Sequence, residues 1–121
     1  AQAYLMLMAG LISEQPNRYS RAWNLGPLES YQYTVRNMLD LMGQYWAYPK
    51  INYRESPFPE AGSLALDSTL AREILGWRPV WNTQKMIAET AMWYRDYYHN
   101  PHNARQFTLN QIQSWREGIE P

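Results

Sequence analysis

One carboxylate, Glu60, follows a stretch of sequence in which regular secondary structure is excluded. Pro57 and Pro59 each remove a backbone donor from residues 55–59, so this segment is predicted to be a rigid, irregular loop. Binding sites are often built on such loops, which makes Glu60 a candidate ligand contact. The alternative is a solvated surface carboxylate, which is the commoner role of an acidic loop residue.

Three side chains near this carboxylate offer further means of recognition. Tyr53 and Phe58 carry aromatic rings that can stack on a base or a sugar, or can instead pack against the neighbouring prolines. Arg54 carries a guanidinium whose paired N–H groups match phosphate oxygens, although a solvated surface charge is the alternative. These residue types indicate binding by stacking and hydrogen bonding.

The sequence contains no recognisable arrangement of catalytic or metal-binding side chains. The two histidines, His99 and His102, fall in one Pro/Asn-rich turn without partners at zinc-ligand spacing, and they are expected to be solvated. A Ser–His–Asp arrangement cannot be built from a single turn. The carboxylates are dispersed, and no pair has a context that would separate their pKa values. The chain alone is therefore expected not to be a catalyst.

Composition limits the class of protein. The chain has 121 residues, 45% of them apolar, which suits one small globular domain. Eleven basic and eleven acidic residues cancel, so duplex nucleic acid and anionic membranes are disfavoured partners. No cysteine is present, which is typical of a protein from the reducing cytoplasm. No targeting segment is recognised, and the apolar run Ala3–Ile12 is too short to span a bilayer.

The same apolar run is the clearest sign of a missing partner. Residues 1–13 are good helix formers with almost no polar face, and a helix that is apolar all round must be covered all round. We expect Tyr4–Ile12 either to mediate self-association or to pack against a preceding part of the protein. The second expectation rests on the chain beginning inside the predicted helix. Ten Tyr and six Trp also suit half-buried surfaces such as interfaces and clefts.

Residues 63–81 have the most complete local signals. Ser63–Leu66 is predicted to be a short strand, and Asp67 or Ser68 is predicted to cap a helix of about two turns. Gly76 can take the left-handed conformation that ends a helix, after which Pro79 prevents further winding.

The remaining elements are predicted from periodicity and caps, and together they give an α+β, mostly helical fold. The expected elements are short strands at 21–25 and 51–54, a helix at 34–45 capped by Thr34, a long helix capped by Asn82 or Thr83, and a last helix that starts with Thr108 and Gln111 in capping-box spacing and stops at Gly118.

Several of these motifs resemble a known family. Glu60-Ala61, Leu64–Asp67 and Leu75–Trp81 resemble the C-terminal signature of the extended short-chain dehydrogenases/reductases that act on nucleotide sugars, the NAD-dependent epimerase/dehydratase family. Within it, the sequence is most similar to the lyases that dehydrate CDP-glucose, where a Trp-Asn-aromatic-Gly-Pro motif matches Trp23–Pro27 except at Leu25. The resemblance extends over nearly the whole chain.

The resemblance implies that residues 1–121 form a substrate-binding lobe whose NAD-binding Rossmann domain is absent. The chain has no glycine-rich dinucleotide turn, and neither Lys50 nor Lys85 has a Tyr four residues before it. No cofactor is therefore expected in this chain, whereas NAD is expected in the intact parent enzyme.

The resemblance also implies roles for the candidate residues. A carboxylate at the position of Glu60 accepts hydrogen bonds from ribose hydroxyls in relatives, and a nearby arginine, here Arg54, pairs with the diphosphate. Two positions depart from the family, because Pro59 replaces a histidine and Pro57 replaces the arginine of some relatives. A nucleotide sugar, CDP-glucose, is the expected ligand. The alternatives are the lobe of another epimerase or GDP-sugar dehydratase, or a free-standing helical module that binds protein.

Overall fold

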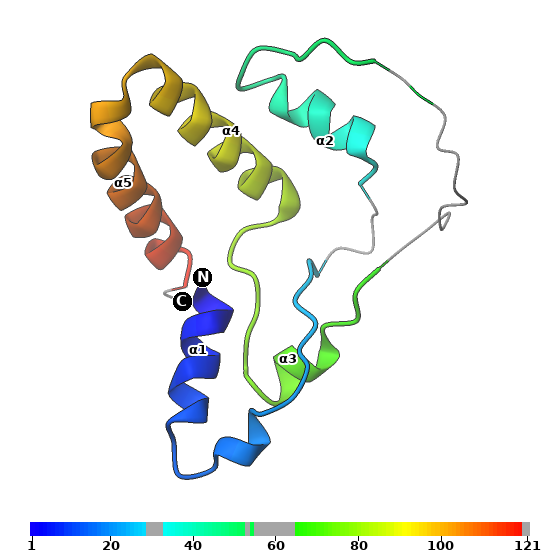
Figure 1. Cartoon of the computed structure of the whole chain (residues 1–121), viewed down its shortest axis with the longest axis vertical. Helices are drawn as coiled ribbons and strands as arrows, with labels where there is room; N and C mark the ends of the chain where they lie inside the picture. The colour runs from blue at the N-terminus through cyan, green and yellow to red at the C-terminus, as the bar shows by residue number, and fades with distance from the viewer. Residues whose placement is uncertain (29–32, 53, 55–64, 120–121) are drawn as a thin grey trace. The chain divides into compact units, whose positions relative to one another are not determined.

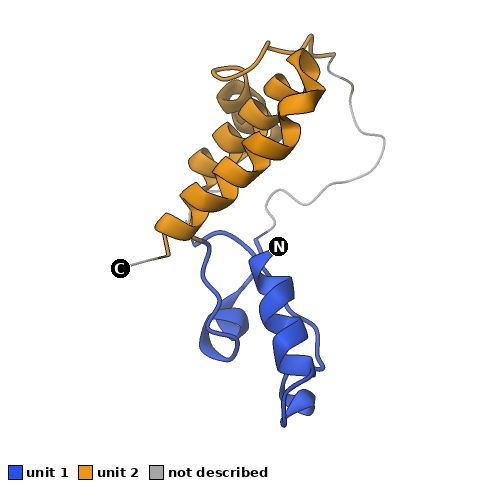
Figure 2. Cartoon of the chain, turned by 90° about the vertical axis from the view of Figure 1, so that its left-hand side faces the viewer, with its two compact units in different colours: residues 1–28, 63–79 blue, residues 29–62, 80–121 orange. Residues whose placement is uncertain are grey.

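The computed structural model describes residues 1–28, 33–52, 54 and 65–119. They fall into two compact units, each made from two separate parts of the sequence (Figure 2). Unit 1 comprises Ala1–Leu28 and Ser63–Pro79, and unit 2 comprises Glu29–Gly62 and Val80–Pro121. All regular structure in the described residues is helical, as Figure 1 shows. The prediction of a small, mostly helical lobe is confirmed.

Unit 1 begins with α1 (Gln2–Leu11), which is followed by the short 3₁₀ helix η1 (Pro16–Arg18). Gly10 allows the two to meet, since a Cβ built there would lie 2.5 Å from Cγ of Tyr19. The hydroxyl of Ser13 donates to the carbonyl of Gly10 at 2.7 Å and closes the end of α1. The chain therefore reverses tightly after α1, with the ring of Tyr19 against the helix end.

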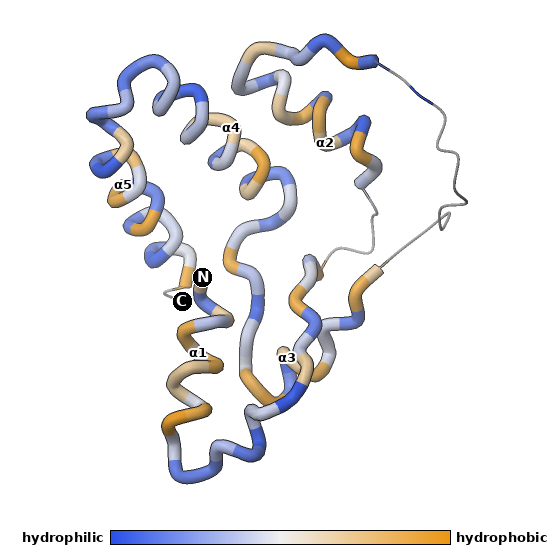
Figure 3. Tube along the Cα trace, in the orientation of Figure 1, coloured by the Kyte–Doolittle hydropathy of each residue, from blue (hydrophilic) through white to orange (hydrophobic). Residues whose placement is uncertain are grey.

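Most residues of α1 are apolar (Figure 3). Ala3 and Gly10 are its buried residues, Met6 and Leu7 are half-buried, and its other large apolar side chains are exposed. Those exposed on α1 and its C-cap are Tyr4, Leu5, Met8, Leu11 and Ile12. The expected helix is confirmed, and its apolar face is exposed.

The second helix of unit 1, α3 (Thr69–Glu73), has the signals that the sequence predicts at both of its ends. Asp67 accepts from the backbone N–H of Thr69 at 2.9 Å, which satisfies one of the free donors of the first turn. At the other end Gly76 has φ +69°, and the N–H of Trp77 donates to the carbonyl of Ala71 at 3.0 Å. Ala71 and Leu75 are buried. The helix is five residues long, shorter than the expected two turns.

Unit 2 is a three-helix arrangement in which α4 (Thr83–His99) lies between α2 (Val35–Met42) and α5 (Ala104–Glu117), as Figure 1 shows. Thr34 and Asn37 form a reciprocal capping box at the start of α2. The side-chain oxygen of Asn82 accepts from the N–H of Lys85 at 2.8 Å and starts α4. Both caps are those that the sequence predicts.

Small residues on α4 allow close packing in unit 2. Its buried positions are Ile87, Ala88 and Ala91. Helices approach closely where the side chains at the contact are short. The core of unit 2 is correspondingly small, and aromatic stacking at the margin adds to it. The ring of Trp46 stacks on Tyr94 at 6.2 Å and on Tyr98 at 5.5 Å between ring centroids.

The start of α5 differs from the prediction. The helix begins at Ala104, and the 3₁₀ helix η2 (Pro101–Asn103) leads directly into it. Thr108 therefore lies inside α5, where its hydroxyl donates to the carbonyl of Ala104 and accepts from Nε1 of Trp93, each at 2.8 Å. The predicted capping box at Thr108 was wrong because this hydroxyl bonds to the preceding turn and to α4.

The predicted short strands are also absent from the described residues. Residues 21–27 and the described residues of 51–54 have no regular structure, and no backbone hydrogen bond joins either segment to another extended segment that the structure describes. A strand exists only when its backbone groups pair with a neighbour. The apolar pattern alone does not supply that neighbour. Of the third predicted strand, Ser63–Leu66, only its last two residues are described, and they are not in a strand.

Candidate functional site

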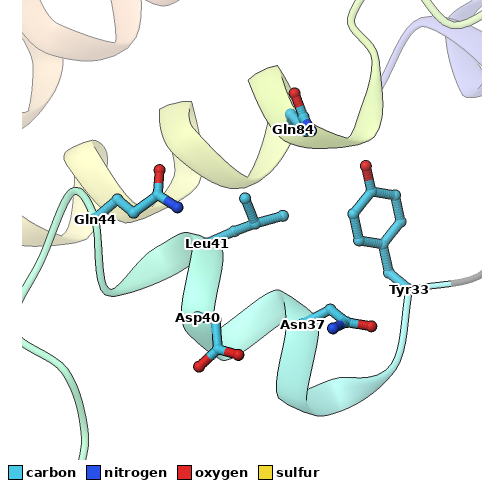
Figure 4. Close-up of a pocket in the computed structure, with 6 residues that line it drawn as sticks. All are labelled: Tyr33, Asn37, Asp40, Leu41, Gln44 and Gln84. Carbon is cyan, nitrogen blue, oxygen red and sulfur yellow. The ribbon is translucent and has the colours of Figure 1, made fainter.

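A hollow of about 430 Å³ opens in unit 2 between α2 and the start of α4. Figure 4 shows the six residues that line it, five of them polar: Tyr33, Asn37, Asp40, Leu41, Gln44 and Gln84. The hollow is shallow and largely open to solvent, so it would bury a ligand only in part. The first five come from α2 and its flanking residues, and Gln84 comes from the first turn of α4.

The spacing of the α2 residues explains why they share one hollow. Positions 37, 40, 41 and 44 follow the i, i+3, i+4, i+7 pattern, which places side chains on one side of a helix. Leu41 points toward α4 and forms an apolar surface in the middle of the group (Figure 4). Tyr33, just before α2, directs its hydroxyl toward the side where Gln84 lies (Figure 4).

Asp40 is the charged residue of this lining, and one of its oxygens is engaged. Oδ1 accepts from the hydroxyl of Tyr48 at 2.7 Å and from Nε of Arg36 at 3.3 Å. The Arg36 pair is exposed, with both side chains about half accessible, so it contributes little to stability. The carboxylate points away from α4 and lies at the rim (Figure 4).

The two glutamines contribute unused hydrogen-bonding groups. Neither Gln44 nor Gln84 forms a side-chain hydrogen bond with any described residue, and both are exposed. A carboxamide offers two donors and an acceptor. In contrast, the side-chain oxygen of Asn37 is engaged in the capping box with Thr34. The hollow therefore combines an apolar surface with free amides that come from two elements.

Of the four site residues expected from the sequence, one is among the described residues. Glu60, Phe58 and Tyr53 lie outside the described residues. Arg54 is described and exposed, and it is not among the residues that line the hollow. The expected nucleotide-sugar contacts stay predictions, and the hollow is a second candidate site that the sequence analysis missed. The signal that would have found it is the polar i, i+3, i+7 pattern of Asn37, Asp40 and Gln44.

The described residues lack two other kinds of functional feature. They contain no group of three His, Cys, Asp or Glu side chains suited to a metal ion. Nδ1 of His99 lies 2.7 Å from the carbonyl oxygen of Arg95, within its own helix. No helix in this part of the chain is long and apolar enough to cross a membrane.

The described geometry thus defines a small helical lobe with a polar hollow, and comparison with known proteins indicates a class for it. The findings support a distant relationship to the NAD-dependent epimerase/dehydratase family. The relative that carries this relationship is CDP-glucose 4,6-dehydratase of Salmonella typhimurium, which is 28% identical over 95 residues. The match covers 76% of this chain but 26% of that enzyme, so the chain corresponds to about a quarter of its length. No protein-family model and no solved structure matches the chain.

Proposed function

We propose that this chain is the nucleotide-sugar-binding portion of an NAD-dependent dehydratase, with CDP-glucose as its ligand. The observation that carries the proposal is the similarity to a CDP-glucose 4,6-dehydratase over most of the chain. The conformation of residues 67–77 agrees with this proposal. The motif on which the family resemblance depends forms a short helix, α3, and Gly76 follows it with a positive φ.

In this proposal the chain binds and positions the ligand, and a separate NAD-binding domain supplies the redox chemistry of the lyase. Glu60 accepts hydrogen bonds from the two ribose hydroxyls, since a carboxylate has two oxygens for two donors. Arg54 pairs with the diphosphate, which suits its exposed guanidinium. Tyr53 and Phe58 stack on the base or the sugar. Positioning lowers a barrier without contact with the reacting atoms.

Calorimetric titration of the purified chain with CDP, GDP and dTDP tests the proposal. We expect CDP to bind most tightly and Glu60→Gln to weaken it about tenfold or more, because charged hydrogen bonds to the ribose are lost. Glu14→Gln, which changes an exposed carboxylate in unit 1, is the matched control and should leave the affinity unchanged. Equal affinity of Glu60→Gln and the unchanged chain would refute the role of Glu60.

The encoding gene provides a second test. A reading frame that continues upstream of Ala1 into a glycine-rich NAD motif supports the two-domain parent enzyme and a cytoplasmic location. A start codon directly before Ala1 contradicts it. That result would favour a free-standing helical interaction module. Preference for GDP or dTDP over CDP in the titration would instead favour another epimerase or dehydratase of the same family.

A further inference from the structure

The hollow between α2 and α4 has a lining that differs from what a nucleotide diphosphate requires. Among its six lining residues the charged one is Asp40, and Arg36 beside it is already paired with that carboxylate. A phosphate brought to this lining would find no lysine or arginine among the lining residues to pair with. Without such a partner it would lose hydration and gain no ion pair, so the lining favours an uncharged ligand.

The lining suits a ligand with many hydroxyl groups and no charge. Each hydroxyl both donates and accepts, so it can pair with either end of the free amides of Gln44 and Gln84. Leu41 provides an apolar surface between these amides, and the ring of Tyr33 adds a second one at the end of the hollow away from Gln44 (Figure 4). A ring polyol has the same combination, with hydroxyls around its edge and C–H groups on its faces.

We propose that this hollow binds an uncharged polyhydroxylated ring compound, held at its edge by Gln44 and Gln84 and on its face by Leu41 and Tyr33. The inference uses none of the residues proposed to contact the nucleotide. Arg54, the one of those residues that the structure describes, does not line this hollow.

An NMR titration of the full chain with three related rings tests the proposal. The probes are myo-inositol, an inositol monophosphate and cyclohexanol, which share a six-membered carbocycle and differ in hydroxyl number and charge. We expect myo-inositol to shift the side-chain amide signals of Gln44 and Gln84 with a millimolar Kd, the usual affinity of a small polar ligand in an open site. The monophosphate and cyclohexanol should bind at least about fivefold more weakly, because the phosphate finds no cation in the lining and cyclohexanol leaves the amides unpaired.

Substitution at the two exposed glutamines separates binding from folding. Gln84→Leu is expected to weaken myo-inositol binding about fivefold, the effect of one lost neutral hydrogen bond, and Gln44→Leu to do the same. Gln113→Leu is the control, since Gln113 is an exposed glutamine of α5 that bonds to Glu117 and lies outside the hollow. Unchanged helix content by circular dichroism confirms that each variant is folded.

Three results would overturn the proposal. The first is the absence of any shift at Gln44 and Gln84 with about 100 mM myo-inositol, well above a millimolar Kd. The second is equal weakening by Gln113→Leu. The third is stronger binding of N-methylacetamide than of myo-inositol, which would assign the hollow to peptide groups. Saturation with CDP should leave myo-inositol binding intact if the two sites are separate.

Discussion

At the scale of single residues, Gly76 controls the end of α3 through its backbone conformation. Its φ of +69° lies in the left-handed region, and apart from its chain neighbours no described residue has an atom within 4 Å of a Cβ built there. We predict that Gly76→Ala lowers the free energy of unfolding by about 1 kcal/mol, and that the cost is conformational because the space is open. Urea denaturation followed by circular dichroism measures it. Gly76→Asn is the control and should cost less, since Asn tolerates this region better, and equal losses would contradict the explanation.

The stability of the start of α3 is expected to depend on pH through the carboxylate of Asp67. The hydrogen bond from the Thr69 side chain, then that from the Thr69 backbone N–H and the charge of Arg72 hold the pKa of Asp67 below its ordinary value of 3.8. A group whose pKa is lower in the folded state stabilises the fold above its unfolded pKa, and this stability is lost as the pH falls through the folded value.

We therefore predict a difference in acid stability between the unchanged chain and Asp67→Asn. Asparagine retains the cap but does not titrate, so the unchanged chain should lose stability more steeply below about pH 4. The effect is small because the carboxylate is exposed. Urea midpoints measured between neutral and strongly acidic pH check this, and parallel curves for the two proteins would show that the cap does not depend on charge.

At the scale of elements, two side-chain contacts join α4 to α5. Nε1 of Trp93 donates to the hydroxyl of Thr108 at 2.8 Å, and the amide of Gln111 donates to both the backbone and the carboxylate of Glu89 at 2.7 and 2.9 Å. Glu89 also pairs with Lys85 at 2.9 Å, and its side chain is the less exposed of the two. These contacts fix the register of the two helices.

Comparing substitutions at two threonines, Thr108 and Thr90, measures the contribution of the hydrogen bond between Trp93 and Thr108. Thr108→Val should lower the free energy of unfolding by about 1 kcal/mol or less, because a partly exposed hydrogen bond to Trp93 is lost. Thr90→Val is the matched control. Thr90 likewise donates to the carbonyl four residues earlier, that of Met86 at 2.8 Å, but the structure gives it no bond to α5. Thermal unfolding followed by Trp fluorescence compares them, and equal losses would show that the helix–helix bond contributes nothing.

At the scale of the whole molecule, the exposed apolar side chains of α1 motivate a further proposal. We propose that Tyr4–Ile12 mediates self-association, because Leu5 is 66% and Met8 62% exposed. The double substitution Leu5→Glu and Met8→Glu is expected to give a monomer where the unchanged chain forms larger species in sedimentation velocity. Val35→Glu, at a residue of α2 that is 75% exposed, is the control and should leave the association intact. A monomeric unchanged chain at high concentration would refute the proposal.

Features that depend on residues close together in the sequence were predicted correctly, and features that depend on distant residues were not. The caps of α2, α3 and α4 depend on residues within a few positions of one another, and they were predicted correctly at Thr34, Gly76 and Asn82. The start of α5 was predicted wrongly because Thr108 bonds to Trp93, fifteen residues away. The predicted strand at 21–25 failed for the same reason, since its formation depends on a distant partner.

The sequence by itself determined the mostly helical character of the lobe and the caps of α2, α3 and α4, because capping and helix propensity act within one or two turns. It also supplied the family motifs on which the nucleotide-sugar proposal depends. Only the tertiary structure decided where α5 begins and which side chains meet in the hollow. Gln84 joins the polar residues of α2 through the packing of α4 on α2, a contact between residues forty positions apart for which local sequence contains no signal.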